Sequence, residues 1–185
     1  MKLSILVPYI QRHTKFFFKL HFELCRQILP YAGQIQLLPD DHEYDSIGTK
    51  RNRLLDKAVG EYLCFFDADD LPSDDYVDLL MEGVETGCDC ASLRGEITID
   101  GGKPEIFEHS LKYKEWRTTK NEIKYERYPN HLNMIRADID KQFQFPETNF
   151  GEDHNWSKQI HESKLLKTEH YIPEVIYYYN YVSIK

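Results

Sequence analysis

The sequence predicts an α/β fold with a mostly parallel central sheet flanked by helices and a smaller β region. Three observations support this prediction. Short apolar runs alternate with segments of helical apolar spacing over the first half of the chain. A Pro-Tyr pair or an acidic segment lies just past the end of each predicted strand of that half. The second half instead carries a glycine-containing turn between two strand-like runs and a Tyr-rich segment. A length of 185 residues fits one domain, 1–185, with halves 1–90 and 91–185.

The strands of the first half are short, apolar and rich in branched or aromatic residues. We expect them at Leu3–Pro8, Ile35–Leu38 and Tyr62–Phe66, with Pro39 closing the second strand. Between them, helices are predicted over 14–29 and 49–59, the latter stopping at Gly60. A third helix is expected after Pro72, with Ser73 as its N-cap and two aspartates, 74 and 75, in its first turn.

The second half reads as a β region followed by a helix and a late strand. Runs 91–99 and 105–108 flank the sequence DGGKP and predict a hairpin. Residues 112–129 lack clear periodicity and are predicted to form a loop that covers the substrate. Residues 132–136 are expected to return to the sheet, 152–163 to form a helix, and 175–182 to form a strand.

Composition excludes several classes of protein. The net charge of −8 argues against a nucleic-acid partner, since binding phosphate backbones requires clustered Lys and Arg. No apolar run approaches the roughly 20 residues of a transmembrane helix, and the N-terminal apolar run is too short for a secretory signal, so we expect a cytoplasmic protein. The four cysteines show no zinc-type spacing and are interpreted as buried free thiols.

An acidic cluster follows the third predicted strand. Carboxylates Asp67, Asp69 and Asp70 repel one another, and a divalent cation such as Mg²⁺ or Mn²⁺ is the simplest compensation. In an extended chain Asp67 and Asp69 point the same way, while the small Ala68 lets a ligand approach the backbone. Capping of the next helix is the alternative role for Asp70. Residues 8–9 and 40–41 lie just past the ends of the other two predicted strands, so a parallel sheet would gather all three segments at one edge.

The run GTKRNRLLDKAVGEYLCFFDADDLPSDDYV resembles the central block of the family 2 glycosyltransferases of GT-A fold, and SILVPYI is similar to that family's first strand. The resemblance implies a GT-A fold in which residues 1–90 bind the nucleotide and residues 91–185 bind the acceptor. It also implies a nucleotide-sugar donor, with a UDP-sugar favoured, whose diphosphate is held through Mn²⁺ or Mg²⁺.

The same resemblance assigns donor-side roles to individual residues. Asp69 would bind the metal, and Asp67 would contact the ribose or the metal's water shell. Pro8 and Tyr9 would line the base pocket, with Ala68 beside the donor. Asp40 or Asp41 would accept a hydrogen bond from the base, although the family's Asp-Asp-Gly-Ser reads Asp-Asp-His-Glu here. Arg51 would reach the base or the phosphates, or else lie on a solvated helix face. His170 is the candidate third metal ligand; the family's closing histidine after the Tyr-rich strand is missing.

A second motif, Gly-Glu-Asp at 151–153, begins a predicted helix, where the dipole alone favours acidic residues and also keeps a carboxylate ionised. It resembles the acceptor-side motif of the same family and of the β-1,4-galactosyltransferases, which makes Asp153 the general base and Glu152 an acceptor contact. His131 is expected to face the cleft. Trp156 and Trp116 are candidates for stacking on sugar rings, with core packing as the alternative.

One base, one metal and no dedicated nucleophile predict a single displacement with inversion, catalysed by a hexosyltransferase-type enzyme acting on a glycan or lipid-linked acceptor. Three alternatives remain. A haloacid-dehalogenase-type phosphatase would use Asp67 as nucleophile, but its motif normally ends the first strand. A sugar nucleotidyltransferase needs a Gly-rich loop after the first strand, and VPYIQRHTK has no glycine. A non-catalytic nucleotide-sugar-binding module would keep the D-x-D motif without turnover.

Overall fold

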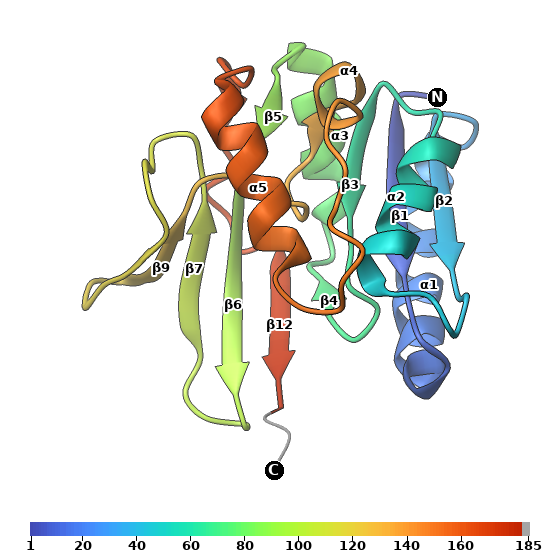
Figure 1. Ribbon diagram of the computed structural model, residues 1–185, viewed down its shortest axis with the longest axis horizontal. Coiled ribbons are helices and arrows are strands. Elements are labelled where there is room, and N and C mark those ends of the chain that lie inside the picture. The colour runs from blue at the N-terminus through green and yellow to red at the C-terminus, as the bar shows by residue number, and fades with distance from the viewer. Residues whose placement is uncertain (183–185) are drawn as a thin grey trace.

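The computed structural model describes residues 1–182, which form two six-stranded sheets with helices packed around them (Figure 1). The central sheet has the order β11-β5-β10-β3-β1-β2, and β10 alone among its described strands runs against the others. The expected mostly parallel sheet is therefore confirmed. Its strands are β1 (Leu3–Pro8), β2 (Ile35–Asp40), β3 (Tyr62–Phe65), β5 (Cys90–Ala91), β10 (Ile135–Arg136) and β11 (Glu169–His170).

The second sheet has the order β4-β12-β6-β7-β9-β8 and holds as many strands as the first. The predicted hairpin is confirmed, because β6 and β7 pair antiparallel, and the Tyr-rich strand β12 lies parallel to β6. The strands are β4 (Leu71–Pro72), β6 (Leu93–Ile99), β7 (Glu105–His109), β8 (Arg117–Thr118), β9 (Ile123–Arg127) and β12 (Tyr177–Tyr181).

Helices cover both faces of the central sheet, and the alternation of side chains along each strand explains why the strands are apolar throughout. Leu3, Ile5 and Val7 of β1 pack in the same core cluster as α1 and α3. Leu6 points to the opposite face and packs with α2 and α5. The helices are α1 (Thr14–Ile28), α2 (Ile47–Lys57), α3 (Tyr76–Thr86), α4 (Ala137–Asp140) and α5 (Glu152–Ser163), with single 3₁₀ turns at Gln11–His13 and Leu29–Tyr31.

Proline did not end the second strand as predicted. β2 continues through Pro39 to Asp40, in register with Val7 and Pro8 of β1. β2 lies at the edge of the sheet and pairs with β1 alone, so the missing N–H of Pro39 can face away from the ladder. The longer strand brings Asp40 level with Pro8, which places the ends of β1 and β2 side by side.

The predicted helix boundaries were wrong at two places. Helix α2 begins at Ile47, capped by the Ser46 side chain, and ends at Lys57. Gly60 is not its stop residue; a Cβ there would lie 2.5 Å from the Ser4 backbone nitrogen, so glycine serves a close approach to β1. Helix α3 begins at Tyr76 without a side-chain cap, and Ser73 instead donates to Asp75 Oδ1.

The segment 112–129 was predicted as a loop, but it contains β8 and β9, which extend the second sheet. Most of its residues are charged, polar or aromatic, so no clean apolar period appears in the sequence. The return of residues 132–136 to the central sheet and the helix over 152–163 are confirmed. Within residues 1–182, no helix is long and apolar enough to cross a bilayer.

Candidate active site

A cleft of about 570 Å³ lies where β1 and β3 end, and we call it the strand-end cleft. Parallel strands carry their carboxyl ends to one edge, which is why segments distant in sequence meet here. Pro8, Tyr9 and Ala68 line it, and so do Asp67 and Asp69, as predicted for a common site. Its other walls come from the segments 10–13, 43–47 and 149–152, with Arg51, Asp70 and Tyr179.

Arg51 of α2 is the central polar group of the cleft. It is only 3% exposed, so its role as a solvated helix residue is excluded. Its guanidinium donates to Glu152 Oε1 and, at 2.9 Å, to Asp67 Oδ1, and its Nη2 lies 3.1 Å from His131 Nε2. The rings of Phe145 and Phe65 lie 5.5 and 5.8 Å from its Cζ atom. Arg51 therefore joins α2, β3, α5 and the segment before β10.

The three clustered carboxylates have different partners, and their pKa values do not all shift in the same direction. Burial raises the pKa of Asp67, but Arg51 and His131 outweigh it and hold that pKa well below its usual range. Burial and the charge of Asp67 raise the pKa of Asp69, which lies 3.5 Å from His13 Nδ1. Asp70 is buried, and its pKa is raised well above normal. The larger cause is this burial, and the next is the charge of Asp67.

Tyr177 of β12 links the cluster to the second sheet. Its hydroxyl donates to Asp70 Oδ2 at 2.7 Å and accepts a hydrogen bond from the backbone N–H of Asp67 at 3.3 Å. The other oxygen of Asp70, Oδ1, is buried without a hydrogen-bond partner among the described residues. An unpaired buried carboxylate oxygen beside Asp69 is a position that a cation can use.

The cluster fits a divalent metal held by few protein ligands. Within the described chain, no group of three or more His, Cys, Asp and Glu side chains is arranged to hold a metal. Mg²⁺ is commonly bound by one or two carboxylates together with the phosphates of a substrate. Asp69, whose side chain is 43% exposed and lines the strand-end cleft, and the unpaired oxygen of Asp70 fit that kind of site.

The neighbouring strand ends are held by two cations that sequence reasoning did not single out. Lys50 is fully buried and donates to the Tyr9 carbonyl at 2.6 Å, and burial lowers the pKa of this lysine. Arg53 Nε donates to Asp40 Oδ2 at 2.6 Å. Burial raises the pKa of Asp40, but Arg53 and the His42 N–H outweigh it and lower that pKa. Lys50 and Arg53 flank Arg51 in the sequence KRNR, and this basic cluster is the sequence feature that could have identified them.

The two aspartates at the end of β2 are thus not equivalent. Asp40 is buried and paired with Arg53, whereas Asp41 is exposed and accepts a hydrogen bond from the Tyr9 hydroxyl at 3.4 Å. Neither aspartate lines the strand-end cleft; Glu43, Tyr44 and Asp45 do so from the following turn. Of the two candidates, Asp41 is the one with an accessible carboxylate beside Tyr9.

A second cleft of about 420 Å³, the aromatic cleft, adjoins the first, and Asp67, Asp70 and Tyr179 line both. Asp153 and His131 line it, as predicted, while Glu152 lines the strand-end cleft instead. Gly151 precedes α5 with φ of +73°, a conformation that favours glycine and lets the helix begin at Glu152. The remaining walls are mostly apolar and aromatic, chiefly from β6, β7, β9 and β12, and they also carry His109 and Arg127.

Trp116 is the tryptophan that lines the aromatic cleft. Its ring centroid lies 4.6 Å from that of His154, the residue after Asp153. Trp156 does not line either cleft: it is fully buried and stacks on Phe145 at 4.7 Å. The prediction that Trp156 contacts the acceptor is therefore wrong. This side chain lies on the side of α5 that faces the central sheet, and it packs in the core.

The structure does not bring His170 together with the aspartates. It lies on β11 at the far edge of the central sheet, next to Gly83 of α3, and lines neither cleft. Its side chain follows β11, whose position depends on pairing with β5, and no local pattern in the sequence reveals that pairing.

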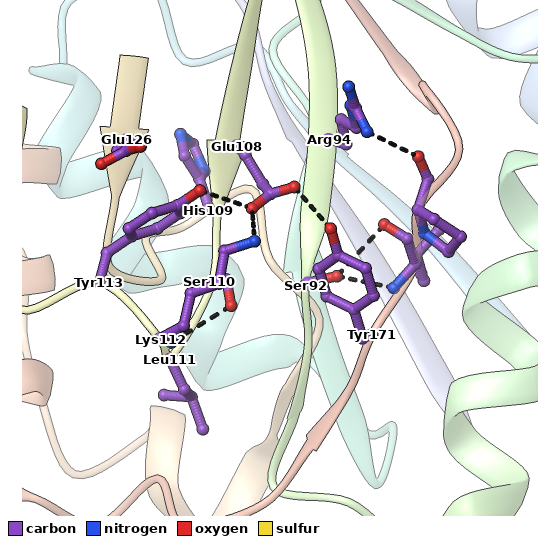
Figure 2. Close-up of polar contacts among 12 residues, drawn as sticks. Ser92, Arg94, Glu108, His109, Ser110, Leu111, Lys112, Tyr113, Glu126 and Tyr171 are labelled. Carbon is purple, nitrogen blue, oxygen red and sulfur yellow. Dashed lines mark hydrogen bonds and ion pairs between the residues drawn. The ribbon is translucent and has the colours of Figure 1, made fainter. Parts of the chain in front are cut away.

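A buried carboxylate anchors the segment that carries Trp116 (Figure 2). Glu108 of β7 is fully buried and accepts hydrogen bonds from Tyr113 at 2.7 Å and Tyr171 at 2.8 Å, and it pairs with Lys112. Burial raises the pKa of Glu108, but Lys112 and the two hydroxyls outweigh it and lower that pKa. Together with the hydrogen bonds from Ser110 and Leu111 to Glu169 of β11, this network fixes residues 110–113 between the two sheets.

Comparison with known proteins gives one family and one fold. Residues 23–156 match the family described as Glycosyl transferase family 2, which covers well over half of the chain. No curated protein sequence matches the chain significantly.

Among solved structures, the chain is similar to crystal structures of S. aureus TarS. TarS 1-349 in complex with UDP-GlcNAc matches with a TM-score of 0.63 and 15% identity, over 100% of this chain and 60% of that one. A further TarS crystal structure matches with the same score and identity, over 97% of this chain and 37% of that one. The chain thus spans less than two thirds of these structures, and at this identity the likeness shows the fold alone.

Proposed function

Because the chain belongs to glycosyl transferase family 2, we propose that it transfers a sugar from a nucleoside-diphosphate sugar to a hydroxyl group of an acceptor. The observation that carries the proposal is the meeting of the two clefts at Asp67. The metal-competent Asp69 stands in one cleft and Asp153 in the other. A transferase needs this arrangement, since donor and acceptor must reach one reacting carbon from different sides.

The strand-end cleft is proposed to bind the donor. Tyr9 and Pro8 would line the base, with the exposed Asp41 as hydrogen-bond acceptor. A UDP-sugar is favoured, and the TarS structure that holds UDP-GlcNAc supports this choice through its shared fold. Arg51 would act mainly by positioning, because its guanidinium is already bound to Asp67 and Glu152.

A divalent cation, Mn²⁺ or Mg²⁺, is proposed to bind at Asp69, with Asp67 and Asp70 beside it. When bound, it would supply positive charge to the departing diphosphate. Arg51 and His131 keep Asp67 ionised, and the Tyr177 hydroxyl orients Asp70. These side chains would hold the acidic cluster in place before the donor arrives.

Asp153 is proposed to act as the general base. Its carboxylate removes the proton of the acceptor hydroxyl while that oxygen forms a bond to the anomeric carbon of the donor sugar. The bond from this carbon to the phosphate oxygen breaks, and the nucleoside diphosphate leaves with the electron pair. One displacement inverts the anomeric configuration. Asp153 lies in the first turn of α5, at the positive end of the helix dipole.

The acceptor, a glycan or lipid-linked intermediate, would lie in the aromatic cleft. Trp116 and the tyrosines of β9 and β12 offer faces on which sugar rings stack. His131 is proposed as a further contact. Glu152 is committed to Arg51, so we propose that it holds α5 against α2 and thereby fixes the position of Asp153.

The phosphatase alternative is weaker, because a nucleophilic Asp67 would need a free carboxylate oxygen. Oδ1 of Asp67 accepts from Arg51, and Oδ2 lies 3.5 Å from His131 Nε2. Strong pairing of this kind lowers the nucleophilicity of a carboxylate. Hydrolysis of simple phosphate esters by the purified protein, lost in Asp67→Asn, would nevertheless favour that alternative.

Two substitutions test the proposal. Asp69→Asn should abolish Mn²⁺-dependent binding of UDP, measured by calorimetry, and Asp153→Asn should abolish sugar transfer while UDP binding stays intact. Asp74→Asn removes one charge from a fully exposed carboxylate nearby and serves as the control. Unchanged transfer by Asp153→Asn would exclude the base assignment. Retained binding without transfer in the wild type, across UDP-, GDP-, dTDP- and CMP-sugars, would favour the non-catalytic binding module.

A further inference from the structure

Most arginines of this acidic chain are paired with carboxylates. Six of the eight, all within residues 1–182, lie within 4 Å of an Asp or Glu oxygen. The two without such a partner are Arg12, which lines the strand-end cleft, and Arg127, which lines the aromatic cleft. In a chain with 31 acidic residues, an arginine left unpaired inside a cleft is unusual and points to a ligand.

Arg127 is held in a defined position. It ends β9, and its Nη1 donates to the carbonyls of Arg117 at 3.0 Å and of Glu126 at 3.2 Å. Its Cζ lies 5.0 Å from the ring centroid of Trp116 and 5.5 Å from that of Tyr125. Two aromatic faces and two carbonyls orient the guanidinium without neutralising it.

The electrostatics of Arg127 are those of a cation that lacks a counter-ion. It is half-buried, and loss of solvation lowers its pKa, outweighing an opposing contribution from Tyr125. It is the sole Lys or Arg side chain among the residues that line the aromatic cleft. His109 in the same wall stays neutral, because burial and His131 lower its pKa to about 3.

A second unpaired donor lies beside Arg127. The indole Nε1 of Trp116 is buried without a hydrogen-bond partner among the described residues. A buried N–H without a partner is costly, and a ligand that accepts from it removes that cost. Arg127 and Trp116 thus both line one cleft, on the side formed by the second sheet, and each carries a donor without a carboxylate partner.

We propose that the acceptor carries an anionic oxygen group, a carboxylate or a phosphate, which binds Arg127 in the aromatic cleft while the acceptor hydroxyl faces Asp153. This inference rests on the proposed glycosyl transfer and narrows its acceptor class to acidic sugars or phosphorylated polyols. The planar guanidinium matches either group through two parallel hydrogen bonds. It would also offset the repulsion between an anionic acceptor and the carboxylates of Asp67, Asp70 and Asp153.

Paired small-molecule probes test the charge requirement. Glucuronic acid is compared with glucose, and glycerol 3-phosphate with glycerol, in the presence of UDP and Mn²⁺. Binding is followed by tryptophan fluorescence, because Trp156 is buried in the core and Trp116 lines the cleft. We expect at least one anionic probe to bind tenfold or more tightly than its neutral partner. The probe that does so distinguishes carboxylate from phosphate.

Three variants assign that preference to Arg127. Arg127→Gln should reduce the preference for the anionic probe to less than twofold, and Arg127→Lys should retain part of this preference. Lys124→Gln removes the same charge from the same strand, outside the cleft, and should leave it unchanged. Equal binding of anionic and neutral probes by the wild type would overturn the proposal, as would equal effects of the Arg127 and Lys124 substitutions. UDP binding, measured in the same samples, separates this failure from failure of the donor site.

Discussion

Replacing Arg51 by methionine should destabilise the protein by about 3–5 kcal/mol, the cost of removing one partner from a buried ion pair. Methionine has a similar length and can keep contact with Phe65 and Phe145, so packing changes little. The lost charge leaves two carboxylates, Glu152 and Asp67, facing each other at the point that Arg51 filled. Glu152 is only 5% exposed, so solvent cannot take the place of the guanidinium.

For a domain of this length, 1 kcal/mol corresponds to about 2–4 °C in melting temperature, so a decrease of roughly 6–20 °C is expected. Thermal unfolding followed by circular dichroism, without ligands, measures it. Arg26→Met is the control, because Arg26 pairs with Glu23 on the exposed side of α1, and exposed pairs contribute about 1 kcal/mol or less.

The pairing also predicts non-additivity. Adding Glu152→Gln to Arg51→Met should recover part of the loss, because it removes one of the two unpaired carboxylates. A decrease no larger than that of Arg26→Met, or a double variant that shows the full sum of the two single losses, would refute the assigned role of Arg51.

Three further substitutions probe the clefts and their supports. The unfolded chain protonates His109 below pH about 6.5, while the folded pKa is about 3, so stability should fall by about 2 kcal/mol from pH 6.5 to 5. His109→Asn should remove that fall, measured by urea unfolding. Gly48→Ala places a Cβ 1.8 Å from the Pro146 carbonyl oxygen and should cost about 1–3 kcal/mol or more, read from the urea midpoint. Tyr177→Phe removes the hydroxyl that donates to buried Asp70, which should cost about 1–3 kcal/mol and weaken Mn²⁺-dependent UDP binding.

Each of these variants has its own contradicting result. A pH dependence that survives His109→Asn would place the relevant proton elsewhere. Gly48→Ala should be compared with Lys57→Ala on the same helix, and equal midpoints would mean that the loop at Pro146 yields freely. Normal UDP binding by Tyr177→Phe would show that Asp70 needs no donor to keep its place in the cluster.

The strand-end segments could be predicted from sequence because their position depends on local patterns and one topological rule. Apolar runs predicted β1 and β3, and the intervening helices predicted that these strands pair in parallel. Parallel pairing places Pro8, Tyr9 and Asp67–Asp69 at the same edge of the sheet. Helix α5 was predicted with its observed bounds, since Gly151 and the acidic first turn mark its start.

What sequence did not reveal depends on contacts between segments far apart in the chain. Trp156 and Trp116 are alike as sequence features, yet one is core and one lines a cleft, because the helix α5 presents Trp156 toward Phe145. His170 was predicted to bind the metal because it follows the candidate base in the sequence. Pairing of β11 with β5 instead places it at the edge of the central sheet opposite to β2. Arg127 stood in a segment predicted to be a loop.

The acidic cluster shows how the two sheets depend on one another. Arg51 of α2 and His131 before β10 compensate Asp67, and Tyr177 of β12 donates to Asp70. Each compensating group thus comes from a different part of the chain, and Tyr177 belongs to the second sheet. The repulsion among these carboxylates is therefore compensated in full only when both sheets are assembled. Substitutions that weaken donor binding through Tyr177 should for this reason also loosen the packing of β12, whereas Asp69, which points into the strand-end cleft, can be changed without that cost.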